Sequence, residues 1–379
     1  MRCYCVIVTA PGPGAGGGMS IYLQFLDALS QSFEHQECEE DWHIFIDDGM
    51  PMPSLPNVCY HVWRARGLGR LWFDVAGFNH IVKSEGIIPD AVFSLQNSTV
   101  RCPKARRHII YFHQPLALYH YKMSLFEKRA KTYYFYHCLY PLYIKLFMDK
   151  TNSFVAVQTQ TVRKRFAEKF GYPASRVGVF FPRIEMVKNL PDDHPWAFEE
   201  NTYHFLYPAN PSPYKEHVTI AYALNRLYAK NPQMAQKVRI HFTAQAGSMA
   251  KLEQYLAVHG MTQNVIFHGI VSHEQLLSML KSCHGLLFPS VIETIGLPLL
   301  ESASLGLPII ANHLDYAHEV LEGYEGTHFV PVHDYDVWAE SILSLCGGLK
   351  RYAPYVRPHD DSWARLLKII REGWCEKGF

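Results

Sequence analysis

Apolar and amphipathic stretches alternate through the first half of the chain. Residues 3–10 (CYCVIVTA) form a short, continuous apolar run, which predicts a buried strand. A glycine-rich turn follows, and residues 19–33 then show helical spacing of the apolar residues Ile21, Phe25, Leu26 and Leu29. Further strands are predicted at residues 42–47, 88–95 and 108–115. Strands separated by helices imply a parallel sheet that is covered on both faces.

The same alternation restarts after a polar, proline-bearing break at residues 189–201, which we interpret as a linker. Beyond it, strands are predicted at residues 203–210, 237–244, 264–270, 285–290, 307–312 and 327–332. Helices are predicted at residues 217–231, 274–283 and 297–306. The pattern of residues 361–379 is also helical, and we expect this helix to return to the first domain. The predicted domains are residues 1–188 with 355–379, and residues 202–354.

Length and composition agree with two globular domains. A chain of 379 residues is too long for one ordinary hydrophobic core. Lysine and arginine number 36 against 35 acidic residues, so the overall charge does not favour a nucleic-acid partner. The nine cysteines are scattered without a Cys-x-x-Cys pair, which favours buried thiols over a disulfide or zinc framework and indicates a reducing compartment. The first apolar run breaks at Pro11, so we expect neither a signal peptide nor a spanning helix.

Two acids, Glu293 and Glu301, lie eight positions apart on either side of a Gly-Leu-Pro step. Pro298 would occupy the first turn of the helix that follows and Gly306 would lie near its end, so Glu293 is expected in the preceding loop. The amides of residues 294–297 would then point away from the helix and could bind phosphate. From spacing alone, the two acids could be a catalytic pair across a sugar ring, clamps for a ligand, or the solvated face of a helix.

Residues 265–321 resemble the C-terminal half of the large retaining glycosyltransferase family 4, the group 1 transferases with a Glu-x7-Glu signature. The resemblance implies the GT-B fold, which is an α/β architecture of two Rossmann-like domains with a C-terminal helix that returns to the N-terminal domain. It also implies that Glu301 holds the nucleotide ribose and that Glu293 lies beside the donor sugar. The sugar hydroxyls and the diphosphate would be bound by the amides of Thr294, Ile295, Gly296 and Leu297.

Lys215 follows a predicted strand, from which a lysine could reach phosphate as a point charge. The resemblance places it on the donor diphosphate, and the alternative is a solvated loop lysine. Five positions earlier the family usually has an arginine, whereas this chain has Asn210 in the predicted donor site. One positive charge is therefore absent, and Arg183 or Lys188 could replace it.

Two features of the N-terminal half match the same family. Gly16, Gly17 and Gly18 separate the first strand from its helix, but they form neither a complete G-x-G-x-x-G motif nor a P-loop. The resemblance makes them the loop that faces the donor phosphate and the acceptor. His113 ends a strand at the carboxyl edge of the predicted sheet, where α/β proteins bind ligands, and it matches the family's histidine near the donor sugar.

Asp47 and Asp48 end the second predicted strand. In the other glycosyltransferase fold, an acidic motif binds a divalent ion that neutralises the leaving diphosphate. These two aspartates are adjacent rather than spaced as Asp-x-Asp, and we interpret them as turn residues. We therefore expect no cofactor and no obligatory metal.

Residues 119–150 hold six lysines or arginines against two acids, interleaved with many tyrosines and phenylalanines. Helices of this composition can lie at a lipid interface, and they could also cradle the diphosphate of an acceptor. The alternative is a buried helix pair with a solvated basic face. The balanced overall charge argues against binding of single-stranded nucleic acid.

Together, these features predict a cytoplasmic retaining glycosyltransferase, with peripheral contact to the inner face of the membrane. It would move a hexose-type sugar from a nucleotide-diphosphate donor to a saccharide or lipid-linked saccharide, in the synthesis of a cell-surface polysaccharide of the O-antigen or capsule kind. His113, Glu293 and Lys215 are the predicted catalytic residues. A GT-B scaffold or binding subunit without turnover is the alternative, and Asn210 favours it. A Rossmann oxidoreductase would need a glycine spacing that residues 9–18 lack.

Overall fold

The computed structural model describes residues 2–8, 17–34, 40–63, 68–121, 130–148, 151–183, 196–355 and 362–374. The chain divides into two compact units. The first unit comprises residues 1–120, 125–183 and 359–379, and the second comprises residues 121–124 and 184–358. Most of the predicted linker and Lys188 lie outside the described residues.

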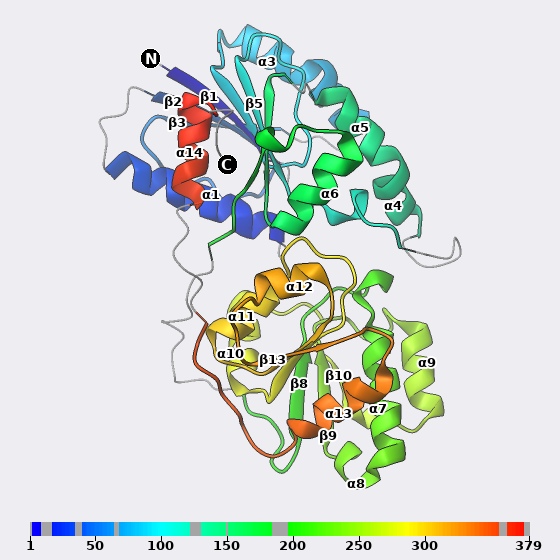
Figure 1. Cartoon of the computed structure of the whole chain (residues 1–379). Helices are drawn as coiled ribbons and strands as arrows, with labels where there is room; N and C mark the ends of the chain where they lie inside the picture. Colours follow the sequence, from blue (N-terminus) through cyan, green and yellow to red (C-terminus); the bar gives the residue numbers. More distant parts are fainter. Residues whose placement is uncertain are drawn as a thin grey trace. The chain divides into compact units, whose positions relative to one another are not determined.

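Within the described part of the first unit, seven parallel strands form one sheet in the order β3-β2-β1-β4-β5-β6-β7 (Figure 1). They are β1 (Arg2–Ile7), β2 (Glu40–Ile46), β3 (Val58–Val62), β4 (Ala91–Ser94), β5 (Arg107–Phe112), β6 (Ser153–Val157) and β7 (Val177–Val179). The α-helices are α1 (Gly17–Glu34), α2 (Leu68–Trp72), α3 (Phe78–Ser84), α4 (Ala130–Tyr134), α5 (Tyr140–Phe147), α6 (Gln160–Phe170) and α14 (Ser362–Glu372). Short turns of π-helix, η1 (Phe73–Gly77) and η3 (Phe135–Leu139), and of 3₁₀-helix, η2 (Pro115–Ala117) and η4 (Ala174–Arg176), complete the unit.

Apolar side chains cover both faces of this sheet. On one face, Tyr4 packs in a core that includes Phe25 of α1 and Trp363 of α14. On the other face, Phe45 packs edge-on against Phe78 of α3, with ring centroids 5.0 Å apart. A strand buried on both faces carries apolar residues at successive positions, which explains the continuous run at residues 3–10.

The last helix, α14, returns to the first unit and lies beside α1 (Figure 1). Its buried face contributes Leu366, Leu367, Ile369 and Ile370 to the core described above. Arg107 at the start of β5 donates to the carbonyl of Ile370 at 3.0 Å, which anchors the helix end to the sheet. The predicted return of the C-terminal helix is confirmed.

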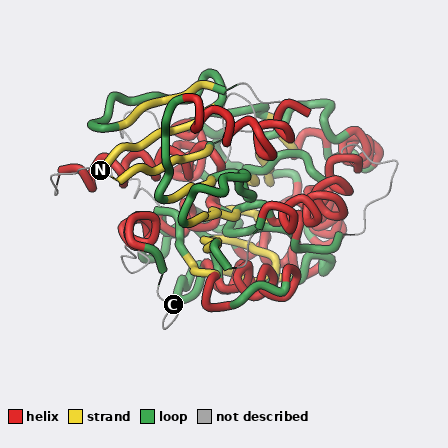
Figure 2. The backbone as a smooth tube through the Cα atoms, turned by 90° about the horizontal axis from the view of Figure 1, so that it is seen from above, coloured by secondary structure: helices red, strands yellow, loops and turns green. Residues whose placement is uncertain are grey.

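The described part of the second unit contains one parallel sheet of six strands, in the order β10-β9-β8-β11-β12-β13. They are β8 (Tyr203–Tyr207), β9 (Val238–Phe242), β10 (Val265–Phe267), β11 (Gly285–Phe288), β12 (Ile309–Asn312) and β13 (Thr327–Val330). The helices are α7 (His217–Lys230), α8 (Pro232–Ala235), α9 (Ala250–Val258), α10 (His273–Ser282), α11 (Leu297–Ser304), α12 (Asp315–Val320) and α13 (Tyr335–Ser344), with 3₁₀ turns η5 (Pro213–Lys215) and η6 (Thr262–Asn264). Figure 2 shows helices in red beside the strands in yellow.

The strand order of each sheet reverses at one point. In the first sheet, β2 and β3 follow β1 toward one edge, while β4 to β7 continue toward the other edge. In the second sheet, β9 and β10 follow β8 toward one edge, while β11 to β13 continue toward the other. Loops that follow the two strands at such a switch point separate and leave a crevice at the carboxyl ends, where open α/β sheets bind ligands. We therefore expect a ligand-binding site in the second unit at the loops that follow β8 and β11.

Helix α1 differs from its predicted start. Gly17 and Gly18 lie in its first turn, whereas the sequence predicted a loop there and a helix from residue 19. Gly16 lies outside the described residues. The glycines precede an amphipathic run that is long enough to propagate the helix backwards at a cost of about 1 kcal/mol per glycine.

The cysteines also differ from their prediction. All seven cysteines in the described residues are free, but Cys59 and Cys138 are exposed and Cys3 is half-buried. The prediction of buried thiols is therefore confirmed at Cys5, Cys102, Cys283 and Cys346, and it does not hold at the other three.

Candidate active site

Lys215 and Glu293 meet at the switch point of the second sheet. Lys215 ends η5 in the loop after β8, and Glu293 lies in the loop after β11. Their side chains form an ion pair of 2.5 Å between Nζ and Oε1, and both side chains are largely buried. The amide of Val291 donates to the carbonyl of Tyr214 at 2.9 Å, which ties the two loops together. The structure therefore brings together two residues that are 78 positions apart.

Tyr207, the last residue of β8, holds this pair in place. Its hydroxyl donates to the carbonyl of Lys215 at 2.5 Å. Burial and the nearby Glu293 carboxylate raise the pKa of Tyr207 well above its usual range, so that its hydroxyl stays protonated and remains a donor. The backbone of Lys215 is thus fixed to the sheet, and its ammonium group is aimed at the loop after β11.

The N-terminus of α11 follows Glu293 directly. Gly296 is its N-cap residue, with a left-handed φ of 67°, and Pro298 lies in the first turn as predicted. A Cβ on Gly296 would lie 3.1 Å from the ring of Phe288, so a larger residue would be strained by both its φ and its space. Since Gly296 has no side chain to accept from the first turn, amide donors at this helix end are available to an anion. Of the residues that the sequence proposed as amide donors, Thr294 and Ile295 lie in the bend before Gly296, and Leu297 is the first residue of the helix.

Glu301 lies one turn inside α11, as predicted, and it has a partner that the sequence analysis did not find. Its Oε1 atom is 2.9 Å from Nε2 of His273, the first residue of α10. Its Oε2 atom is buried and has no hydrogen-bond partner within the part of the chain that the structure describes. A buried carboxylate oxygen with unused acceptor capacity can be satisfied by a ligand hydroxyl.

Asn210 occupies the loop after β8 and is exposed. Its side-chain oxygen accepts from the hydroxyl of Ser212 at 2.5 Å, which closes the loop locally. Arg183 was a candidate for the absent positive charge, but in the first unit it forms an ion pair of 2.8 Å with Asp27. The structure therefore gives no support to Arg183 as the replacement.

His113 follows β5 and lies beside the loop after β4 in the first unit. Its backbone amide donates to Oδ1 of Asn97 at 2.5 Å, and Nδ2 of Asn97 lies 3.5 Å from its Nε2. Asn97 adopts a left-handed φ of 67°, a conformation that asparagine tolerates better than most residues. Burial lowers the pKa of His113 to about 4, so the ring is neutral near pH 7. Its Nδ1 atom is buried and lacks a partner among the described residues, so it can bond to a ligand.

A buried carboxylate supports the loop that carries Asn97. Asp74 of η1 is fully buried and pairs with Arg70 at 2.8 Å. It also accepts from the side chain of Gln96 at 3.2 Å and from the hydroxyl of Tyr143. Burial raises the pKa of Asp74, although Arg70 opposes this shift. This network fixes the position of Gln96, the neighbour of Asn97, and so orients His113.

Asp47 and Asp48 form a turn after β2, as the sequence predicted. The amide of Asp48 donates to Oδ1 of Asp47 at 2.9 Å, and Gly49 continues the turn with a φ of 80°. This bond is typical of aspartate at a turn.

The comparisons with known proteins agree with this geometry. Residues 204–347, which include the Lys215–Glu293 pair and α11, match the family model described as Glycosyl transferases group 1. The chain carries a glycosyl transferase domain. A protein of Escherichia coli (strain K12), named as a colanic acid biosynthesis glycosyl transferase WcaC, is 40% identical over 60 residues. That match spans 16% of this chain and 15% of the relative.

Solved structures share the fold over almost the whole chain. WaaG, a glycosyltransferase involved in lipopolysaccharide biosynthesis, has a TM-score of 0.64 at 13% identity, with 98% of this chain and 100% of that chain covered. HepE of Anabaena, solved with UDP and glucose, has a TM-score of 0.62 at 14% identity, with 91% and 89% covered. The two parallel α/β units and these neighbours establish a two-domain, Rossmann-like GT-B fold. With the family match, they indicate a nucleotide-sugar-dependent glycosyltransferase.

Proposed function

We propose that this glycosyltransferase belongs to the retaining family 4 type and transfers a hexose-type sugar from a nucleotide diphosphate. The acceptor is a saccharide or lipid-linked saccharide in the synthesis of a cell-surface polysaccharide. One observation carries the proposal: Lys215, Glu293 and the N-terminus of α11 gather at the switch point of the second sheet, inside the segment that matches the group 1 transferases. The neighbour HepE, solved with UDP and glucose, and the polysaccharide-related names of WaaG and WcaC support the choice of donor and acceptor class.

In this proposal, the positive charge of Lys215 and the amides of α11 stabilise the negative charge that develops on the leaving diphosphate. Glu293 orients the donor sugar and also holds Lys215. Glu301 accepts from the ribose hydroxyls through Oε2, the oxygen that lacks a partner in the described structure. His113 contributes its Nδ1–H to the donor sugar. A leaving phosphate oxygen takes the acceptor proton on the same face, so no separate protein base and no obligatory metal are needed.

The test is thermal stabilisation by UDP, GDP, ADP, TDP and CMP, each alone and with its common sugars. A ligand at 100 times its dissociation constant adds about 2.7 kcal/mol to the free energy of unfolding, which shifts the melting temperature by several degrees. We expect one nucleotide family to stabilise the protein in the presence of a chelator, and the Glu301→Ala variant to lose that shift. The absence of a shift with every nucleotide, with magnesium or without it, would contradict the proposal and favour a scaffold.

We also propose that residues 119–150 contact a membrane surface. In the described part of this segment, Phe135, Leu139, Leu142 and Leu146 are exposed, at spacings of four, three and four that place them along one side of a helix. Lys131 and Lys145 are exposed on the same helices. An apolar stripe with nearby lysines is typical of helices that lie in the headgroup region of anionic lipid. No helix among the described residues has the length and apolarity needed to cross a membrane.

Co-sedimentation with vesicles of anionic and of neutral lipid tests this contact. We expect binding to anionic vesicles that weakens with salt, since lysines bind anionic headgroups electrostatically. Leu142→Glu with Leu146→Glu should abolish it. Val258→Glu with Ile270→Glu, at exposed apolar positions of the second unit, is the matched control. Equal binding by both double variants would contradict the assignment of this segment.

A further inference from the structure

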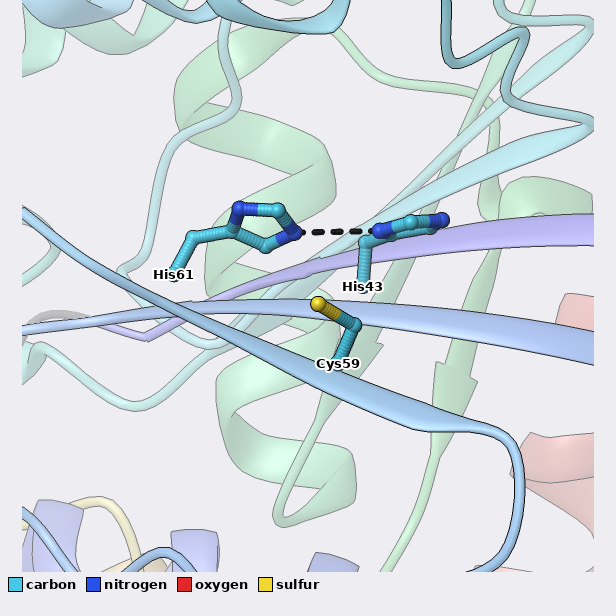
Figure 3. A group of neighbouring side chains, drawn as sticks. All are labelled: His43, Cys59 and His61. Atoms are coloured by element: carbon cyan, nitrogen blue, oxygen red, sulfur yellow. Dashed lines mark hydrogen bonds between the residues drawn. The ribbon is translucent and has the colours of Figure 1, made fainter. Parts of the chain in front are cut away.

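Three potential metal ligands gather at one edge of the first sheet, on the neighbouring strands β2 and β3. His43 of β2, together with Cys59 and His61 of β3, offers two imidazole nitrogens and one sulfur that all lie within 4.8 Å of one another. Figure 3 shows the two rings facing each other, with the sulfur of Cys59 beside them. We propose that these side chains form a binding site for a borderline-soft divalent cation, of which zinc is the expected example.

The sheet register produces this cluster. β2 and β3 are parallel neighbours in which His43 pairs with Cys59 and Phe45 pairs with His61. Side chains two positions apart in a strand share a face, so the three ligands project from the same side of the sheet. The ring of Phe45 stacks on His61, with centroids 4.5 Å apart and an interplanar angle of 12°, and thereby holds the imidazole in its orientation.

A hydrogen bond between the rings of His43 and His61 already points one nitrogen of each ring toward the other. Nδ1 of His43 and Nε2 of His61 are 3.0 Å apart. The second nitrogen of His61, Nδ1, lies 3.3 Å from Oε2 of Glu85, just after α3. A carboxylate on the outer nitrogen of a ligating histidine is the usual way in which proteins orient that ligand and increase its basicity.

The distances suit a tetrahedral ion after a small adjustment. Zinc bound to two imidazole nitrogens at about 2.0 to 2.1 Å holds them about 3.3 Å apart, which is only slightly more than the present separation. The ion would take the place of the proton between the two neutral rings, and that proton would move to Nε2 of His43, so that both rings stay neutral. Cys59 is exposed, so its side chain is free to turn toward the ion, and it would bind as the thiolate after releasing its proton to solvent. Solvent would fill the fourth position.

The donor set also decides which ions fit. Imidazole and thiolate ligands favour zinc and related transition metals, whereas magnesium and calcium prefer oxygen ligands. Because β3 is the edge strand of the sheet, an ion here would join two strands to each other and, through Glu85, to the end of α3. We therefore expect zinc to stabilise the first unit without taking part in sugar transfer.

The test uses the full-length, reduced protein after removal of metal. Zinc is titrated against a chromophoric competitor in the wild type and in Cys59→Ser, His61→Gln and Glu85→Gln variants. Cys138→Ser, which changes a second cysteine that is exposed in the described structure, is the matched control. We expect one zinc ion per chain in the wild type and the control. Glu85→Gln should bind roughly 10- to 100-fold more weakly, as is typical when an outer partner of a ligand is lost, and the two ligand variants more weakly still.

Cobalt gives a second readout that does not depend on affinity. A Co²⁺ ion bound to thiolate absorbs in the near ultraviolet, and this band should appear in the wild type and in Cys138→Ser but not in Cys59→Ser. A wild-type protein that binds no zinc, or ligand variants that bind zinc and cobalt as the wild type does, would overturn the proposal. Thermal stabilisation by the donor nucleotide, measured on the same variants, shows that they are folded. The same measurement tests the proposed sugar transfer, independently of whether the metal site exists.

Discussion

Nζ of Lys215 lies 2.5 Å from Oε1 of Glu293, and both side chains are largely buried beside the N-terminus of α11. Each charge neutralises the other in the absence of a donor. When a diphosphate is bound, Lys215 can interact with the Glu293 carboxylate and with the diphosphate at the same time, because an ammonium group has three donors.

Lys215→Ala is expected to lower both donor affinity and turnover, and to destabilise the protein by roughly 3 kcal/mol because Glu293 is left as a buried, unpaired charge. The double variant Lys215→Ala with Glu293→Ala should recover part of that stability while remaining inactive. Urea unfolding and steady-state kinetics measure the two effects. Lys230→Ala breaks exposed ion pairs with Glu340 and Asp336 and is the control, with little expected change in stability because solvent screens these charges. Full activity of Lys215→Ala would refute its role on the phosphate.

Glu301→Ala should weaken nucleotide binding by roughly 10- to 150-fold, which corresponds to the loss of a charge-assisted hydrogen bond of about 1.5 to 3 kcal/mol. His273→Ala should have a smaller effect, because it removes only the partner of Oε1 and leaves Oε2 for the ligand. Calorimetric titration with the stabilising nucleotide measures both variants. Glu325→Ala, at an exposed acid outside this contact, should bind normally. If Glu301→Ala bound the nucleotide as tightly as the control, the assignment of Glu301 would be wrong.

His113→Ala is expected to lower turnover roughly 100-fold, with a smaller change in donor affinity, if its Nδ1–H acts on the transition state. Asn97→Gly should also lower turnover, but by less than His113→Ala does. Glycine can keep the left-handed φ, while the side chain that holds His113 is removed. Asn57→Gly, at another left-handed asparagine, is the matched control. Unchanged kinetics in Asn97→Gly would show that this side chain does not position the ring.

Four histidines make the stability of the second unit depend on pH. The rings of His204 in β8, His241 in β9 and His268 just after β10 form a hydrogen-bonded row, with nitrogens 2.8 and 2.7 Å apart. His284 accepts from the amide of His204. Burial lowers the pKa of His241 to about 3 and that of His284 to about 4, and it lowers the pKa values of the other two. Arg239 opposes protonation of His204 and His241, and Glu199 favours it at His204.

Unfolded histidines take up protons near pH 6.5, whereas these remain neutral in the folded protein to a lower pH. Their stabilising contribution is therefore complete above pH 6.5 and falls as the pH decreases toward about 3. In that range, each buried ring changes the free energy of unfolding by at most about 1.4 kcal/mol per pH unit. Urea unfolding between pH 4.5 and 7.5 should show this slope, and His241→Gln should make it shallower. His259→Gln, at an exposed histidine, should leave it unchanged. An equal slope in all three proteins would disprove this account.

The sequence predicted the second unit more completely than the first. Its central strands β11 and β12 are buried at every residue and therefore appear as continuous apolar runs between turn residues. In the first unit, β3 is an edge strand without a fully buried residue, and its five residues, VCYHV, are too short an apolar run to stand out, so no strand was predicted there. The adjoining helices α2 and α3, the strands β6 and β7, and helix α6 were also not predicted.

The parts of the candidate site that the sequence did not predict depend on contacts between distant residues. His273 meets Glu301 across 28 positions, and Asn97 meets His113 across 16, so neither pair has a local pattern. The sequence contains only a weak indication that Asp74 is a buried and paired carboxylate. It is an isolated charge within the apolar run LWFDVAGF, and buried charges need partners. The helix start at α10 was visible in the capping box of Ser272 and Gln275, but the contact of its first residue with Glu301 was not.

The return of α14 to the first unit also affects the order in which the protein is made. Trp363 and Ile370 complete a core that includes Tyr4 and Phe25, which are synthesised more than 300 residues earlier. The second unit, residues 121–124 and 184–358, is synthesised entirely before that helix emerges. During translation, the second unit can therefore complete its core first, while part of one apolar face of the first unit stays uncovered until α14 has emerged.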